Sequence, residues 1–261
     1  MTAKTIIDPP SVAPARAGRI LAVASGKGGV GKTWFAITLA HALARAGEHV
    51  LLFDGDLGLA NVDIQLGLMP AHDLASVVEG RVGLAEAAQP HEGGFAILAG
   101  RSGSGALSQL AADRLDRLLG MLRAESARLD RVVLDLGAGL ERSVRRMASF
   151  ADTLLVLATE EPTSLTDAYA ALKLHASDSP AGQARIVVNQ ASSRSAGERT
   201  YATLARACQT FLGHAPALAG VVRRDERVRD AIRRQTLFLT RYPSAPAALD
   251  VETIAAAIRG A

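Results

Sequence analysis

Eight residues near the N-terminus constrain this chain more than any other feature. Residues 26–33 read GKGGVGKT and match the pattern GxxxxGK[ST]. They follow a short apolar run, residues 20–24, and they open a stretch with apolar residues at helical spacing. A strand, a glycine-rich loop and a helix in this order direct backbone N–H groups and a helix N-terminus toward one point. The motif therefore predicts a site for the phosphates of a nucleotide.

Each residue type in this loop has a physical task in phosphate binding. Glycines accept positive φ and let the backbone approach an anion closely, so that several N–H groups can converge on it. Lys32 would neutralise β- and γ-phosphate oxygens, and the Thr33 hydroxyl would bind Mg²⁺. We expect the nucleotide contacts to come from Gly28, Gly29, Val30, Gly31, Lys32 and Thr33.

The rest of the chain alternates short apolar runs with longer stretches of helical period. This pattern predicts an α/β fold of the P-loop NTPase type, a mostly parallel twisted sheet of seven to eight strands flanked by helices on both faces. The expected strands are residues 20–24, 50–53, 96–98, 132–136, 154–158, 186–188 and 218–222. The expected helices are residues 33–46, 110–122, 164–176, 202–212 and 254–259, with Ser164 as the cap of the third.

The composition excludes several other classes of protein. Of the 261 residues 49% are hydrophobic, so the chain can bury a core, and we expect one domain over residues 19–261 after a flexible N-terminal arm, residues 1–18. The single cysteine, Cys208, allows neither an internal disulfide nor a CxxC metal site. No apolar run approaches the roughly 18 residues of a membrane-spanning helix, and no signal-peptide pattern opens the chain. We therefore expect a cytoplasmic protein.

Acidic residues follow two of the expected strands. Asp54 and Asp56 come directly after residues 50–53, and Asp135 lies in the apolar run 132–136. Carboxylates at the C-terminal ends of parallel strands lie at the edge of the sheet that binds ligands. An apolar strand that ends in aspartate is the Walker B pattern, in which the carboxylate holds a metal ion together with the loop hydroxyl. Asp135 and Thr33 are thus candidate Mg²⁺ residues.

The early lysine of the loop is not required by the general motif. With Lys27, the sequence KGGVGKT resembles the signature of the MinD/ParA family of deviant Walker A ATPases. The resemblance implies that Lys27 reaches across an ATP-dependent homodimer to the nucleotide of the partner. It also implies that Asp56 orients the attacking water, that Asp54 supports Mg²⁺ through water, and that Asn189 binds the adenine edge. The segment that follows residues 50–53 and runs to residue 63 would be the first nucleotide-sensing switch, and residues 137–139 the second. ATP and Mg²⁺ are the cofactors that the resemblance predicts.

Three further segments resemble one branch of that family, the flagellar-number regulators FlhG/FleN, also called YlxH. They are residues 56–63 (DLGLANVD), 161–169 (EPTSLTDAY) and 227–235 (RVRDAIRRQ). This resemblance implies a dimerising switch with slow ATP hydrolysis that regulates flagellar number or placement through a protein partner, either a transcriptional activator or an assembly component. Residues 1–18 contain no DQAxxLR motif, so the resemblance does not extend to engagement of FlhF.

Two other functions within the family stay open. A ParA-type ATPase that segregates DNA or cargo would use a cluster of arginines, but three interleaved acids favour an ion-paired, solvated surface there. A MinD-type division-site ATPase would bind anionic membrane, but residues 250–261 contain a single arginine, so we expect only weak, transient contact with the inner face of the plasma membrane. The arginine cluster consists of Arg223, Arg224, Arg227, Arg229, Arg233 and Arg234, with Asp225, Glu226 and Asp230 between them.

Overall fold

The computed structural model describes residues 19–100 and 110–260. The expected N-terminal arm lies outside this range. The sequence also predicts a glycine-rich surface loop at residues 100–105, and all but the first of these residues lie outside the range as well. The limits of the single domain expected over residues 19–261 stay a prediction. In the described part, no helix is both long enough and apolar enough to cross a lipid bilayer.

The described residues form an eight-stranded sheet with the order β3-β4-β2-β5-β1-β6-β7-β8. All neighbouring strands run parallel except β3 and β4, which are antiparallel. The strands are β1 (Arg19–Ala24), β2 (Val50–Gly55), β3 (Gln89–Pro90), β4 (Ala96–Leu98), β5 (Arg131–Leu136), β6 (Thr153–Ala158), β7 (Gln183–Ala191) and β8 (Ala217–Arg223). The predicted P-loop NTPase fold is confirmed.

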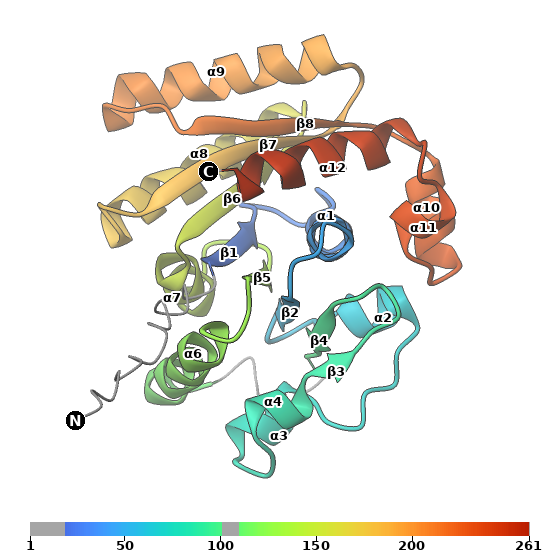
Figure 1. The fold of residues 1–261 in the computed structure, drawn as a ribbon. Helices are drawn as coiled ribbons and strands as arrows, with labels where there is room; N and C mark the ends of the chain where they lie inside the picture. The colour runs from blue at the N-terminus through green and yellow to red at the C-terminus, as the bar shows by residue number, and fades with distance from the viewer. Residues whose placement is uncertain (1–18, 101–109, 261) are drawn as a thin grey trace, which may run out of the picture.

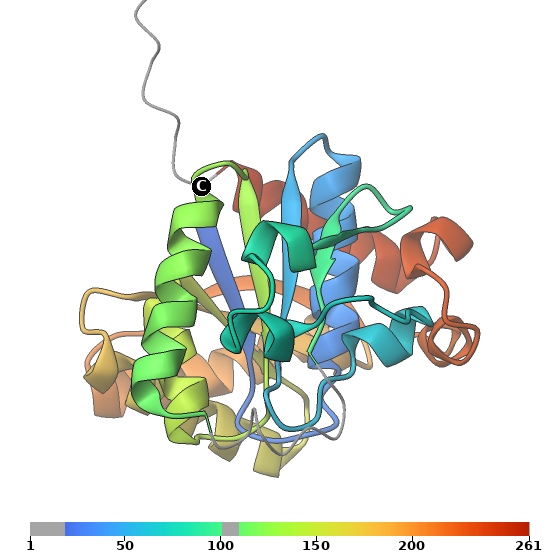
Figure 2. The same cartoon turned by 90° about the horizontal axis from the view of Figure 1, so that it is seen from below.

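Helices cover both faces of the sheet (Figure 1). On one face lie α3 (Leu74–Val78), α4 (Leu84–Ala87), α6 (Ala112–Ser126), α7 (Arg142–Phe150), α8 (Pro162–Asp178) and α9 (Arg194–Leu212). On the other lie α1 (Lys32–Arg45), α2 (Val62–Leu66), α10 (Arg227–Arg233), α11 (Phe238–Arg241) and α12 (Pro246–Arg259). Figure 2 shows α6 and α1 on opposite sides of the central strands.

The two apolar layers explain why the strands lack polar alternation. In β1, Ile20 and Ala22 pack into one layer, while Leu21 and Val23 pack into the other. Both faces of a central parallel strand are covered, so both sets of side chains must be apolar. All six residues of β2 and of β5 are buried, including their aspartates. These strands therefore carry carboxylates into the interior only at the edge where the site forms.

Some predicted elements differ from the structure. Helix α8 begins at Pro162 rather than at residue 164, so Ser164 is not its cap. The Ser164 hydroxyl is buried and accepts a hydrogen bond from Thr159 N instead, at 3.0 Å. Strand β7 extends past residue 188, which places Asn189 inside the strand. Helices α9 and α12 each begin eight residues before the predicted start, at Arg194 and Pro246.

Candidate functional site

The glycine-rich loop connects β1 to α1 at the C-terminal edge of the sheet. Gly29 and Gly31 have φ of 81° and 89°, a left-handed conformation that glycine adopts without strain. A Cβ atom at Gly31 would lie 2.6 Å from Asn189 Nδ2, whereas one at Gly28 or Gly29 would meet no atom within 4 Å. The loop is thus closed toward the protein at Gly31 and open on its outer side.

Lys32 and Asp135 lie together beneath this loop. The Lys32 side chain is buried, and the loss of solvation lowers its pKa, while the nearby charges of Asp135 and Asp56 counteract this effect. Burial raises the pKa of Asp135, and a hydrogen bond from the Thr33 hydroxyl and the charge of Lys32 oppose the shift. The predicted lysine, hydroxyl and Walker B carboxylate are therefore in one place.

Asp54 lies beside Asp135 because the two residues are direct partners in the β2–β5 register. Burial, and then the charge of Asp135, raise the pKa of Asp54. Its Oδ2 atom accepts hydrogen bonds from Asn61 N and Val62 N, both at 3.0 Å. Asp54 thus holds the backbone of residues 56–63, the predicted first switch, in addition to facing the predicted metal site.

Asp56 lies between the two predicted switches. Its Oδ1 atom accepts hydrogen bonds from Leu59 N at 2.9 Å and Gly58 N at 3.3 Å. A Cβ atom at Gly137, in the predicted second switch, would lie 3.3 Å from the Asp56 carboxyl carbon. The Asp56 carboxylate therefore lies against both segments, close enough to Lys32 to affect its pKa.

Lys27 is bound by residues that sequence analysis did not identify as its partners. Its Nζ atom donates to Glu161 Oε2 at 2.5 Å and to Thr163 Oγ1 at 3.0 Å, both near the start of α8. The Lys27 side chain is 30% exposed, in contrast to the buried Lys32. The only sequence signal for this contact is the position of Glu161 just after β6, the strand next to β1.

Asn189 contacts the loop backbone. Its buried Nδ2 atom donates to Val30 O at 2.7 Å, and the neighbouring Gln190 donates to Gly29 O at 3.2 Å. Gln190 was not expected at the site, although it directly follows Asn189 at the same edge. The base contact of Asn189 stays a prediction; the structure adds that this amide fixes the phosphate loop.

The residues present fit a nucleotide with a divalent cation. Asp135 Oδ1 is buried and has no hydrogen-bond partner among the described residues, and a second carboxyl group, Asp54, lies alongside it. A buried oxygen without a partner is costly unless a cation or water satisfies it. The open outer side of Gly28 and Gly29 leaves room for phosphate oxygens.

Four of the six arginines in the cluster have an ion pair within the described residues, in line with the predicted ion-paired surface. Asp225 binds Arg227 at 2.8 Å, and Asp230 binds Arg234 at 3.0 Å. Arg223 binds Asp250 of α12 through Nε at 2.8 Å and Nη2 at 2.9 Å, which gives Arg223 a structural role that its sequence position did not indicate. Trp34, the residue after the phosphate loop, also has a structural role: its ring packs edge-on against Phe238 of α11, with ring centroids 5.2 Å apart.

Comparisons with known proteins agree with this geometry. Residues 21–238 match the CobQ/CobB/MinD/ParA nucleotide binding domain. The chain is 38% identical over 237 residues to the antiactivator FleN of Pseudomonas aeruginosa, covering 91% of this chain and 85% of FleN. It is 30% identical over 187 residues to the flagellum site-determining protein YlxH of Helicobacter pylori, covering 71% and 63% of the two chains.

The fold is that of a solved member of the same family. The cell division ATPase MinD of Pyrococcus furiosus superposes with a TM-score of 0.79 at 22% identity, covering 93% of this chain and 99% of that one. Three findings agree: the family model matches most of the chain, the glycine loop has the expected shape, and the sheet has the strand order described above. The chain belongs to the MinD/ParA family of P-loop ATPases.

Proposed function

We propose that this protein is an ATP-dependent dimerising switch that regulates flagellar number or placement. The flagellar part of the proposal is supported by the similarity to FleN, named an antiactivator, and to YlxH, named a flagellum site-determining protein. Regulation of this kind requires a protein partner, and a transcriptional activator or a component of flagellar assembly is the partner that we propose.

The observation that carries the switch is the different environment of the two loop lysines. Lys32 is buried beside Asp135 and Asp56, where its charge can act only on a nucleotide in its own loop. Lys27 lies at the surface, held by Glu161 and Thr163 of the same chain. We propose that Lys27 leaves these partners when two ATP-bound copies meet, and then binds the phosphates in the opposite copy.

The remaining residues divide the chemistry among them. The loop N–H groups from Gly28 to Thr33 and the Lys32 ammonium bind and orient the phosphates of ATP. Thr33, Asp54 and Asp135 would hold Mg²⁺, which supplies neutralisation of phosphate charge. Asp56 would accept a hydrogen bond from water and direct it toward the γ-phosphate. Hydrolysis then depends on positioning and charge, without a covalent intermediate.

The segments around Asp54 and Asp56 are suited to report the nucleotide state. Asp54 fixes residues 61 and 62, and Asp56 fixes residues 58 and 59, so each carboxylate connects the site to the backbone of the first switch. A bound nucleotide that drew either carboxylate away from these N–H groups would weaken the hydrogen bonds. Binding of a nucleotide would therefore change the conformation of the first switch through Asp54 and Asp56.

Two measurements test the proposal. Light scattering should show a doubled mass with ATP and Mg²⁺ and a single-chain mass with ADP. In cells of the source organism, replacing the native gene by a Lys27→Ala copy should change the number or position of flagella counted by electron microscopy. Normal flagella in a strain with stable Lys27→Ala protein would contradict the flagellar role.

A further inference from the structure

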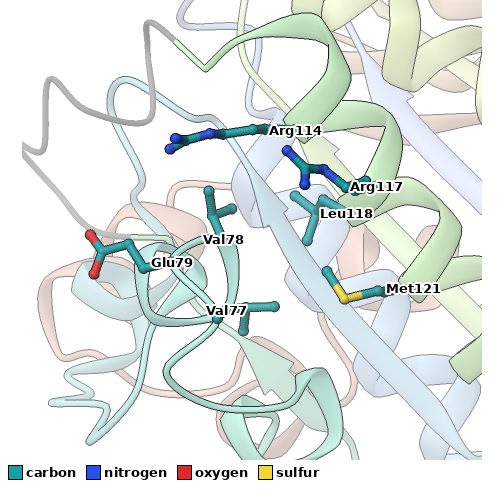
Figure 3. Close-up of a pocket in the computed structure, with 8 residues that line it drawn as sticks. Val77, Val78, Glu79, Arg114, Arg117, Leu118 and Met121 are labelled. Atoms are coloured by element: carbon teal, nitrogen blue, oxygen red, sulfur yellow. The ribbon is translucent and has the colours of Figure 1, made fainter.

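A cleft between α3 and α6 is not used by the nucleotide site. It has a volume of about 650 Å³ and lies between the C-terminal end of α3 and the first half of α6. Figure 3 shows Arg114 and Arg117 extending from α6 toward α3, with Val78 and Leu118 between the two helices. Its apolar part consists of Val77, Val78, Leu118 and Met121.

The apolar part offers a surface that water solvates poorly. Val77 and Leu118 are buried and form its base, whereas Met121 remains 41% exposed although its side chain is large and apolar. Methionine adapts its shape to different partners, and exposed methionine beside a cleft is common at binding surfaces. This part can therefore bury an apolar side chain of another molecule.

The charged part is positive. Among the described residues, the Arg114 side chain has no hydrogen-bond or ion-pair partner, and the Arg117 side chain has only a surface pair with Asp113 in which both side chains are 70% exposed. The one acid that lines the cleft, Glu79, is paired with Arg81 at 2.7 Å and points away from α6 in Figure 3.

One wall of the cleft, helix α3, is connected to the nucleotide site. Helix α3 begins where Leu74 N donates to Ala99 O at 2.9 Å, beside the end of β4. A Cβ atom at the next residue, Gly100, would lie 2.4 Å from the Cβ of Ala60 and 3.4 Å from the carboxyl carbon of Asp54. The backbone that follows β4 thus lies against Ala60 in the first switch and against Asp54, next to the start of α3. A change at Asp54 would reach the cleft from this side.

We propose that this cleft binds a segment of a protein partner in which a carboxylate lies next to a large apolar side chain. The apolar side chain would occupy the space among Val77, Val78, Leu118 and Met121, and the carboxylate would bind Arg114 and Arg117. The proposal deepens the function proposed above, because it names the surface that holds the partner. Charge complementarity favours this occupant over the chain's own residues 1–18, which carry Lys4 and Arg16 against Asp8.

A selection from short random peptides displayed on phage tests this docking site. The target is the full-length protein with Asp56→Ala and Mg-ATP. We expect the selected peptides to combine Asp or Glu with Leu, Met, Phe or Trp. Measured by fluorescence anisotropy, Arg114→Glu/Arg117→Glu should weaken the binding of a synthetic copy by about tenfold or more, as expected when charge-assisted hydrogen bonds are lost.

Two further variants serve as controls. Arg199→Glu/Arg206→Glu makes the same change of charge on α9, at the opposite end of the sheet from α6 (Figure 1), and should leave peptide affinity unchanged. Met121→Gln, at a half-exposed position that tolerates a polar side chain, should weaken binding without lowering thermal stability. Nucleotide binding and ATP-dependent mass are measured on all variants, so that failure of the switch is distinguished from failure of the docking site.

Three results would overturn the proposal. The selected peptides could lack acidic residues, or they could bind equally well to wild type and to Arg114→Glu/Arg117→Glu. Alternatively, Arg114→Glu/Arg117→Glu could abolish the ATP-dependent doubling of mass while it still bound ATP. That last result would show that a second copy of this chain occupies the cleft.

Discussion

Single residues of the site were predictable where one motif defines their task, but their partners were not. The glycine loop, Asp54, Asp56 and Asp135 follow from local sequence and from the rule that ligands bind at the C-terminal edge of parallel strands. The contacts of Lys27 with Glu161 and of Asn189 with Val30 join residues that are 134 and 159 positions apart. Such pairs depend on strand order, which spacing along the chain does not reveal.

Replacing each loop lysine should give two different defects. Lys32→Ala should weaken ATP binding on the order of 100-fold, because hydrogen bonds to charged groups contribute about 1.5–3 kcal/mol each. Lys27→Ala should leave ATP affinity in the single chain nearly unchanged, since that side chain faces Glu161 and Thr163. Calorimetry with a non-hydrolysable ATP analogue compares them. Equal losses of affinity would show that Lys27 binds the nucleotide of its own chain.

Buried His41 should make stability depend on pH. Burial in α1, and then the charges of Arg45 and His91, lower its pKa from 6.5 to about 4. The unfolded chain therefore binds more protons than the folded chain between these values, so stability is full above pH 6.5 and is lost as the pH falls toward 4. For these pKa values, the loss between pH 7.5 and pH 5 is roughly 2 kcal/mol.

Urea unfolding of wild type and of His41→Leu at the two pH values measures this contribution. The variant should lose less free energy of unfolding on acidification than wild type does, although other buried histidines titrate in both proteins. An identical pH dependence in the two proteins would exclude His41 as a cause.

At the scale of elements, sequence patterns predicted the central strands but failed where polar residues enter an element. Strands β2, β5 and β6 lie within two residues of their predicted limits because they are continuous apolar runs. Strand β3 was missed because it has two residues, one of them proline. Helix α9 begins eight residues early because its polar first half, capped by Ser193, lacks an apolar stripe. The spacing of apolar residues reveals an element only where one of its faces is buried, and β3 and the first half of α9 are mostly exposed.

An ion pair between the buried Asp250 of α12 and the partly exposed Arg223 joins α12 to β8. Asp250 is 2% exposed and binds Arg223 through side-chain and backbone donors. Arg223→Ala leaves this buried carboxylate without its main partner and should lower the free energy of unfolding by about 2–3 kcal/mol. The matched control is Arg194→Ala, whose side chain is 60% exposed and 3.3 Å from Asp250, with an expected loss below about 1 kcal/mol. Equal losses in chemical denaturation would contradict the stated role of Arg223.

In the whole molecule, the nucleotide edge joins four segments that are far apart in the sequence. The phosphate loop, the segments that follow β2 and β5, and the start of α8 all lie at the C-terminal ends of the parallel strands. Lys27 of the phosphate loop contacts the start of α8, and Asp56 of the segment after β2 lies against Gly137 of the segment after β5. In the proposed switch, nucleotide binding and self-association are therefore two results of one event.

The mass of the protein in solution tests this central claim most directly. Light scattering during gel filtration should give a single-chain mass without nucleotide and with ADP. Asp56→Ala with Mg-ATP should give twice that mass, because binding is retained while hydrolysis is slow, and Lys27→Ala/Asp56→Ala should return to the single-chain mass. A mass that is the same with every nucleotide, in protein shown to bind ATP, would contradict the account.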